Sequence, residues 1–78
     1  MNGSDFLKLK KITQTMLAKE LNCTVANVSL WFSGTTSPKI ESVENITKAL
    51  NALGANTNYV EVFTVLQETR KEYKQRRA

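Results

Sequence analysis

The sequence predicts an all-α protein, built as one compact domain of four to five helices. Apolar residues recur at intervals of three and four across residues 40–53, which is the spacing of a helix with one buried face. Two shorter segments with helical spacing, residues 13–21 and 25–32, are separated by only three residues. With 78 residues, three Gly and one Pro, the chain has the length of a single domain and too few flexible residues for a linker.

The first two predicted helices cover residues 4–10 and 13–21. Ser4 can cap the first helix and Thr13 the second, because a side-chain oxygen just before a helix accepts a hydrogen bond from a free N–H group of the first turn. The apolar residues that would face the core are Phe6, Leu7 and Leu9 in the first helix and Leu17 and Leu21 in the second.

A sharp turn at Asn22 leads into the third predicted helix, residues 25–32. Asn tolerates the left-handed backbone conformation that ends a helix, and Thr24 can cap the helix that follows. Gly34 is the expected end of this third helix. Cys23 from the turn is also expected to face inward. The residues predicted to be buried together in the core are Leu17, Leu21, Val28, Trp31, Ile46 and Leu50.

The fourth predicted helix covers residues 40–53 and ends at Gly54. A polar loop precedes it, in which Ser37 is a candidate cap and Pro38 suits the first helical position. The apolar stripe of this helix consists of Ile40, Val43, Ile46, Thr47, Leu50 and Leu53.

Two alternatives are open for residues 59–66. β-branched and aromatic residues favour a strand, whereas the spacing also fits a helical stripe. From residue 67 onward, strong helix formers favour a helix. We therefore expect a fifth helix, with a short strand at 59–66 as the alternative. Residues 55–78 would extend a core domain of residues 1–54 within the same compact unit. The stripe would consist of Tyr59, Val62, Phe63, Leu66 and Tyr73.

The charge of the chain favours a polyanionic partner. Eleven Lys and Arg residues against seven Asp and Glu give a net charge of +4. Such a surplus is also typical of solvated helix faces, so charge alone does not identify the partner. The basic residues gather in two clusters, Lys8, Lys10 and Lys11 near the amino terminus and Arg70, Lys71, Lys74, Arg76 and Arg77 near the carboxyl terminus.

Several function classes are excluded by residues that the sequence lacks. It has no His and a single cysteine, Cys23, so an internal disulfide is impossible and a structural metal site is not expected. We find no nucleophile–base pair, acid cluster or phosphate loop, and expect neither an enzyme nor a cofactor. No apolar run approaches the ~18–20 residues that span a bilayer, and no signal-peptide pattern is present. We therefore expect a cytoplasmic protein without a membrane partner.

Residues 13–34 have the spacing of a helix-turn-helix unit, in which the second of two short helices inserts into the major groove of DNA. The pattern TQxxLAxxL from Thr13 is followed by TxxxVSxWxxG from Thr24, then by a Pro and the pattern IxxAL. Over about residues 6–53, this set resembles the Cro/repressor family of helix-turn-helix proteins. The resemblance implies a lambda-repressor-like fold and a small phage- or prophage-type transcriptional regulator that binds a double-stranded DNA operator.

The resemblance also implies which residues contact DNA. Gln14, at the start of the second helix, would contact a phosphate, and exposed residues of the third helix would read bases. Asn27 can pair bidentately with adenine, and apolar side chains can contact thymine methyl groups. The implied base readers are Val25, Ala26, Asn27 and Leu30. Candidates for hydrogen bonds to phosphates or bases are Thr24 and Ser29, and candidates for backbone contacts after the helix are Thr35, Thr36, Ser37 and Lys39.

Two departures from the family pattern leave a second function open. The third helix has no Arg, Lys or Gln, and Phe32 stands where a glutamate is common, which indicates either rearranged packing or an exposed apolar contact. The first hypothesis is a DNA-binding homodimer that pairs through its C-terminal segment, because one short helix reads only a few base pairs. The alternative is a module that modulates a partner repressor protein through Val25, Leu30 and Phe32, without strong DNA binding of its own.

Overall fold

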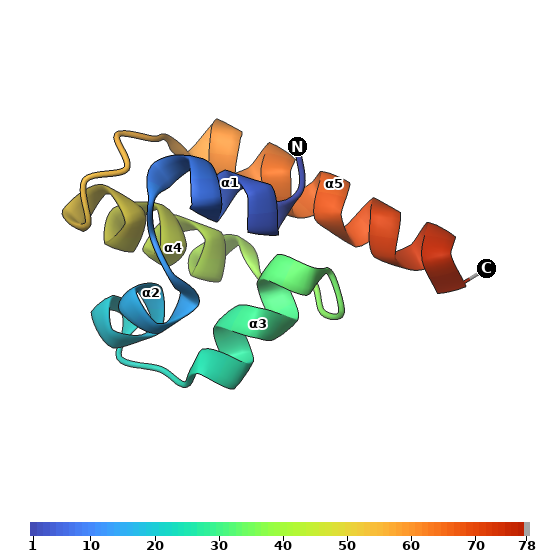
Figure 1. Cartoon of the computed structure of the whole chain (residues 1–78), viewed down its shortest axis with the longest axis horizontal. Helices are drawn as coiled ribbons and strands as arrows, with labels where there is room; N and C mark the ends of the chain where they lie inside the picture. Colours follow the sequence, from blue (N-terminus) through green and yellow to red (C-terminus); the bar gives the residue numbers. More distant parts are fainter. Residues whose placement is uncertain (78) are drawn as a thin grey trace.

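Five helices and no strand make up residues 1–77, the part of the chain that the computed structural model describes. In chain order they are α1 (Gly3–Lys10), α2 (Gln14–Leu21), α3 (Val25–Ser33), α4 (Ile40–Ala52) and α5 (Tyr59–Arg77) (Figure 1). The predicted all-α class is therefore confirmed. The strand alternative for residues 59–66 is wrong, because this segment forms the first turns of α5. Asn58 caps that helix by accepting a hydrogen bond from the Glu61 N–H at 2.9 Å.

The turn between α2 and α3 is built by the residues that the sequence predicts. The hydroxyls of Thr13 and Thr24 each accept a hydrogen bond from the backbone N–H three residues further on, at 3.1 and 3.2 Å. Asn22 (φ 56°) and Gly34 (φ 86°) adopt the left-handed conformation after α2 and α3. Local signals therefore fix both ends of the two helices.

Two predicted helix caps are wrong, although the fourth helix begins at Ile40 as predicted. Asn2, rather than Ser4, caps α1, because its side-chain oxygen accepts a hydrogen bond from the N–H three residues further on at 2.8 Å. The fourth helix begins after Lys39, so Ser37 and Pro38 lie in the preceding loop and neither caps it. Lys39 is extended (ψ 162°), which prevents the helix from starting earlier, and an acidic residue in the first turn stabilises the start without a side-chain cap.

The core draws residues from all five helices. Of the predicted group, Leu17, Val28, Ile46 and Leu50 are fully buried, and α5 adds Val62, Val65 and Leu66 to the same cluster. Leu21 and Trp31 are half-buried at the edge of this cluster, so their prediction as fully buried residues is wrong. Three other residues of the predicted apolar stripes are exposed, because they lie near helix ends or turn away from the core: Leu9, Ile40 and Phe63.

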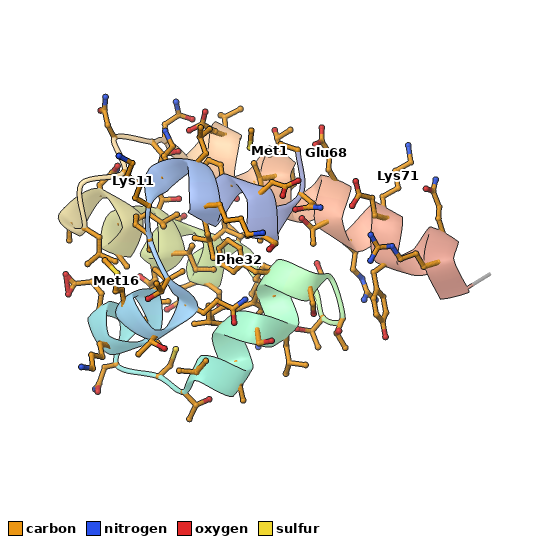
Figure 2. All side chains as sticks on the ribbon, in the orientation of Figure 1. Met1, Lys11, Met16, Phe32, Glu68 and Lys71 are labelled. Carbon is orange, nitrogen blue, oxygen red and sulfur yellow. The ribbon has the colours of Figure 1, made fainter. Side chains whose placement is uncertain are left out.

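Phe32 is a core residue. Only 3% of its surface is exposed, and its side chain points into the interior below α1 (Figure 2). The ring fits because Gly3, at the start of α1, has no side chain, and a Cβ there would lie 2.8 Å from Cδ1 of Phe32. Of the two alternatives that the sequence left for Phe32, rearranged packing is therefore correct and an exposed contact for a partner is wrong.

Hydrogen bonds from α5 fasten the amino terminus and the end of α3. The Gly3 N–H donates to Thr69 Oγ1 at 2.6 Å. Arg70 Nη1 donates to the carbonyl oxygens of Gly34 and Thr35, at 2.7 and 2.6 Å. The helix can approach this closely because Gly34 has no side chain. A Cβ at this position would overlap the Thr69 carbonyl group. Beyond these contacts, the last turns of α5 project past the rest of the molecule (Figure 1).

Candidate nucleic-acid interface

α2 and α3 form one packed unit joined by a three-residue turn. Ala18 on α2 is buried, and the Cys23 N–H donates to the Ala18 carbonyl oxygen at 3.0 Å, which closes the turn. On α3, Val28 and Phe32 lie one turn apart and both are buried. Because residues four apart share one face of a helix, the opposite face of α3 is turned toward solvent.

The solvent face of α3 carries the four predicted base readers. Val25 (43% exposed) and Leu30 (38% exposed) are its large apolar side chains, and Ala26 and Asn27 are also exposed. Ser29 is half-buried beside them. No residue of α3 is charged, so this face offers one amide, a hydroxyl and apolar surface.

The two polar residues at the starts of the helices occupy different settings. Gln14 is the first residue of α2 and is half-buried, at the end of the helix where free N–H groups and the helix dipole favour a negatively charged partner. Thr24 is exposed, but its hydroxyl already accepts the capping hydrogen bond of α3. Any contact that Thr24 makes to DNA therefore comes in addition to its role as a cap.

The loop after α3 holds the remaining predicted residues. Thr36, Ser37 and Lys39 are exposed, whereas Thr35 is half-buried. The Thr35 hydroxyl shares a hydrogen bond of 2.9 Å with that of Ser33. The structure therefore brings all the predicted site residues to α3 and its cap, to the start of α2 or to this loop, and Thr35 is the least accessible of the predicted loop residues.

Sequence reasoning missed two residues that shape this surface. Ser33 is the exposed last residue of α3, and the signal for it was its position one turn after Ser29, on the same side of the helix. Arg70 fixes the loop through two carbonyl groups that lie 35 and 36 residues earlier in the chain. Its place in a basic cluster gave no indication of these partners.

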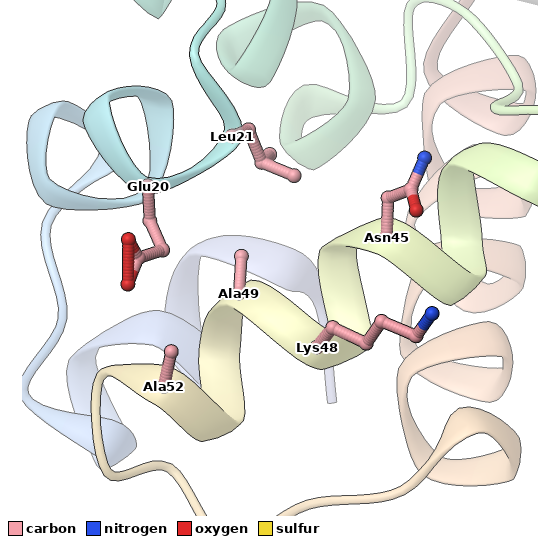
Figure 3. Close-up of a pocket in the computed structure, with 6 residues that line it drawn as sticks. All are labelled: Glu20, Leu21, Asn45, Lys48, Ala49 and Ala52. Carbon is pink, nitrogen blue, oxygen red and sulfur yellow. The ribbon is translucent and has the colours of Figure 1, made fainter.

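This arrangement presents polar and apolar side chains that are suited to recognition. Within residues 1–77, no three His, Cys, Asp or Glu side chains gather closely enough to hold a metal ion. None of the helices described here is long and apolar enough to cross a membrane. A groove of about 380 Å³ lies between α2 and α4, and Figure 3 shows Leu21 reaching into it from α2 above the small side chains of Ala49 and Ala52.

Comparison with known families agrees with this geometry. The model of the helix-turn-helix family matches residues 5–54, which contain α2, α3 and α4 and most of α1. No curated protein and no solved structure matches the chain significantly. The matched family is one of DNA-binding proteins without enzymatic activity. The chain therefore belongs to the helix-turn-helix family of DNA-binding proteins, as a member of the Cro/repressor type.

Proposed function

We propose that this protein is a sequence-specific transcriptional regulator that inserts α3 into the major groove of a double-stranded operator. The observation that carries the proposal is the exposed face of α3, whose opposite face is anchored in the core by Val28 and Phe32. The major groove of B-DNA is about 12 Å wide and admits one α-helix. A helix held this firmly can keep its side chains in register with base edges.

Specific readout in this proposal depends on Asn27. Its exposed amide can form a bidentate pair with an adenine, in which the amide NH2 group donates a hydrogen bond to N7 and the amide oxygen accepts one from the N6 amino group. Val25, Ala26 and Leu30 contribute contacts to thymine methyl groups, and Ser29 contributes a hydrogen bond from the edge of the helix. We therefore expect A·T pairs among the base pairs that α3 contacts.

Contacts to phosphates position the helix in the proposed complex. Gln14 at the start of α2 and Lys39 after α3 would contact the backbone on either side of the groove. Thr24, Thr35, Thr36 and Ser37 supply further hydroxyl groups. These contacts carry no sequence information, so their loss weakens binding to all sequences alike.

The test begins by selecting preferred duplexes from a random pool and measuring affinity across a salt series. Asn27→Ala should cost about 1–3 kcal/mol on the preferred site and relax the choice at one base pair. Lys39→Ala should weaken binding to preferred and random duplexes equally and reduce the salt slope by about 0.9.

Asn45→Ala is the matched control, because Asn45 is an exposed asparagine on α4, outside α2, α3 and their loop. This variant should bind as the parent does. If Asn27→Ala and Asn45→Ala bind the selected duplex equally well, α3 does not read bases through Asn27. If the parent shows no affinity for any duplex at low salt, the proposal itself is wrong.

The proposal includes a homodimer that pairs through α5. Val60 (71% exposed) and Phe63 (39% exposed) lie one turn apart on this helix and offer apolar surface for a second copy. Val60→Asp should shift the protein from dimer to monomer in analytical ultracentrifugation and weaken binding to a two-half-site operator. A parent that remains monomeric both free and on DNA would contradict this part of the proposal.

A second candidate function keeps support from the same face of α3. Val25 and Leu30 are apolar and exposed, and α3 has no charged residue, which also suits contact with an apolar patch on a partner repressor. Phe32 takes no part in such a contact because it is buried. If Asn27→Ala and Lys39→Ala bind DNA as the parent does while Leu30→Asp abolishes a repressor complex, this second function replaces the first.

A further inference from the structure

The positive charge of the chain is concentrated at its C-terminal end. Residues 1–69 contain six basic and six acidic residues, whereas residues 70–78 contain five basic residues and one acidic residue, Glu72. The net charge of +4 therefore belongs entirely to the last nine residues. Neutralisation of phosphates supplies much of the affinity of DNA-binding proteins, and α3 is uncharged. The basic residues of this segment are therefore the main source of net positive charge for attracting DNA.

The structure places part of this charge beside the predicted DNA surface. Thr69 and Arg70 fix α5 to the start of α1 and to the loop after α3, so the direction of the following turns is set. Arg76, two turns further on, lines a groove of about 280 Å³ together with Gln14 and Ser33. Gln14 is the residue expected to contact a phosphate, and Ser33 ends the recognition helix α3.

The two lysines of the same helix end lie elsewhere. Lys71 and Lys74 line a separate hollow on α5 together with Gln67 and Glu68. Figure 2 shows Lys71 pointing away from α3. Positions 71 and 76 are five residues apart, which places them on nearly opposite sides of a helix with 3.6 residues per turn. Arg76 is therefore directed to the groove, and the lysines are directed to solvent on the other side.

We propose that this groove receives a phosphate of the DNA backbone, held between Gln14 from α2 and Arg76 from α5. The proposal rests on the proposed function and extends it, because it adds a contact from the C-terminal helix to the contacts made by α2, α3 and the loop. The guanidinium group of Arg76 supplies the charge-assisted hydrogen bonds that the uncharged recognition helix lacks. Ser4 and Ser33 add hydroxyl groups to the wall of the same groove.

Glu72 gives the proposal a second, opposite prediction. It is half-buried and lines the same groove, one turn before Arg76. A carboxylate at this place repels a phosphate, so it limits affinity. Replacing Glu72 with Gln should therefore strengthen binding, whereas replacing Arg76 with Gln should weaken it.

The experiment measures binding of the full chain to its selected duplex by fluorescence anisotropy between 0.05 and 0.3 M salt, a range of about 6 to 14 Å in screening length. Arg76→Gln should reduce the salt slope by about 0.9, which corresponds to about an eightfold loss of affinity at 0.1 M relative to a 1 M reference. Lys71→Gln, which removes one charge from the same helix end, is the matched control. Its loss of affinity, expressed as the change in log Kd, should be less than half of that of Arg76→Gln. Glu72→Gln should bind more tightly than the parent.

The outcomes separate this inference from the proposed function. If the parent binds the duplex but Arg76→Gln and Lys71→Gln lose equal affinity and slope, or Glu72→Gln binds no better than the parent, the groove does not hold a phosphate and DNA binding through α3 still stands. If the parent binds no duplex, the proposed function fails first. Circular dichroism should show that each variant is folded, because Lys71 and Arg76 are exposed and Glu72 is only half-buried.

Discussion

Replacing Phe32 with Ala should destabilise this protein more than replacing Trp31 with Ala, although Trp is the larger residue. Phe32 is 3% exposed and lies against the start of α1, where Gly3 leaves no side chain to fill a cavity. Its neighbours cannot relax freely, because the Gly3 N–H is fixed to Thr69 on α5. We therefore expect Phe32→Ala to cost about 4–5 kcal/mol, in the upper part of the range for buried aromatic residues.

Trp31 is half-buried, so its removal forfeits only part of the transfer free energy and leaves a hollow that water can enter. About 2 kcal/mol is the expected cost of Trp31→Ala. A domain of this size has about 4–12 kcal/mol in total, so Phe32→Ala would remove between about a third and all of its stability.

Urea unfolding followed by far-ultraviolet circular dichroism measures both costs, at one fixed protein concentration because a dimer would make stability depend on concentration. Leu30→Ala, an exposed residue of the same helix, is the control and should change stability little. A Trp31→Ala variant that loses as much stability as Phe32→Ala would refute the assignment of Phe32, rather than Trp31, to the centre of the packing between α1 and α3.

Three further predictions follow from the ends of the chain and the loops. Gly34→Ala should cost more than Gly54→Ala in the same urea assay. Both residues have positive φ, a strain of about 1–2 kcal/mol for Ala, but only at Gly34 would a Cβ also meet a neighbouring helix. Thr69→Val should cost about 1–3 kcal/mol, because it leaves the buried N–H of Gly3 without an acceptor, whereas Thr69→Ser should retain most of the stability. The hydrogen bond and attraction from Glu68 raise the pKa of the terminal ammonium, so their stabilisation is complete below the unfolded pKa and lost as pH rises through the folded value. The stability difference between the parent and Glu68→Gln should therefore disappear in alkaline solution, and a difference that grows with pH would contradict it.

Short-range signals predicted the helix-turn-helix unit well. Thr13, Asn22, Thr24 and Gly34 each act within three or four residues of their own position, through a capping hydrogen bond or a left-handed backbone conformation. Such effects depend on the identity of one side chain and are visible in a sequence. The predicted DNA contacts on α3 and on the start of α2 came from the resemblance to the Cro/repressor family, whose pattern includes Thr13, Thr24 and Gly34.

Long-range packing could not be predicted in the same way. Phe32 is buried because Gly3, 29 positions earlier, leaves room for its ring, and Arg70 finds its acceptors in a loop that lies 35 and 36 positions earlier in the chain. Trp31 was expected in the core together with Val28, but the next residue, Phe32, occupies that place and Trp31 is half-buried. These outcomes depend on how helices cross, which the apolar spacing of each helix leaves undetermined.

The contacts of α5 with the start of α1 and with the loop after α3 have a consequence for how the protein folds and is degraded in a cell. The last helix supplies core residues, the acceptor for the start of α1 and the donor that holds the loop after α3. During synthesis α5 follows the other helices out of the ribosome, so α3 and the start of α1 lack this support until α5 has emerged. Cleavage within residues 53–58, between α4 and α5, would remove that support again. Loss of the packing around α3 can therefore begin with a single cut outside α2 and α3.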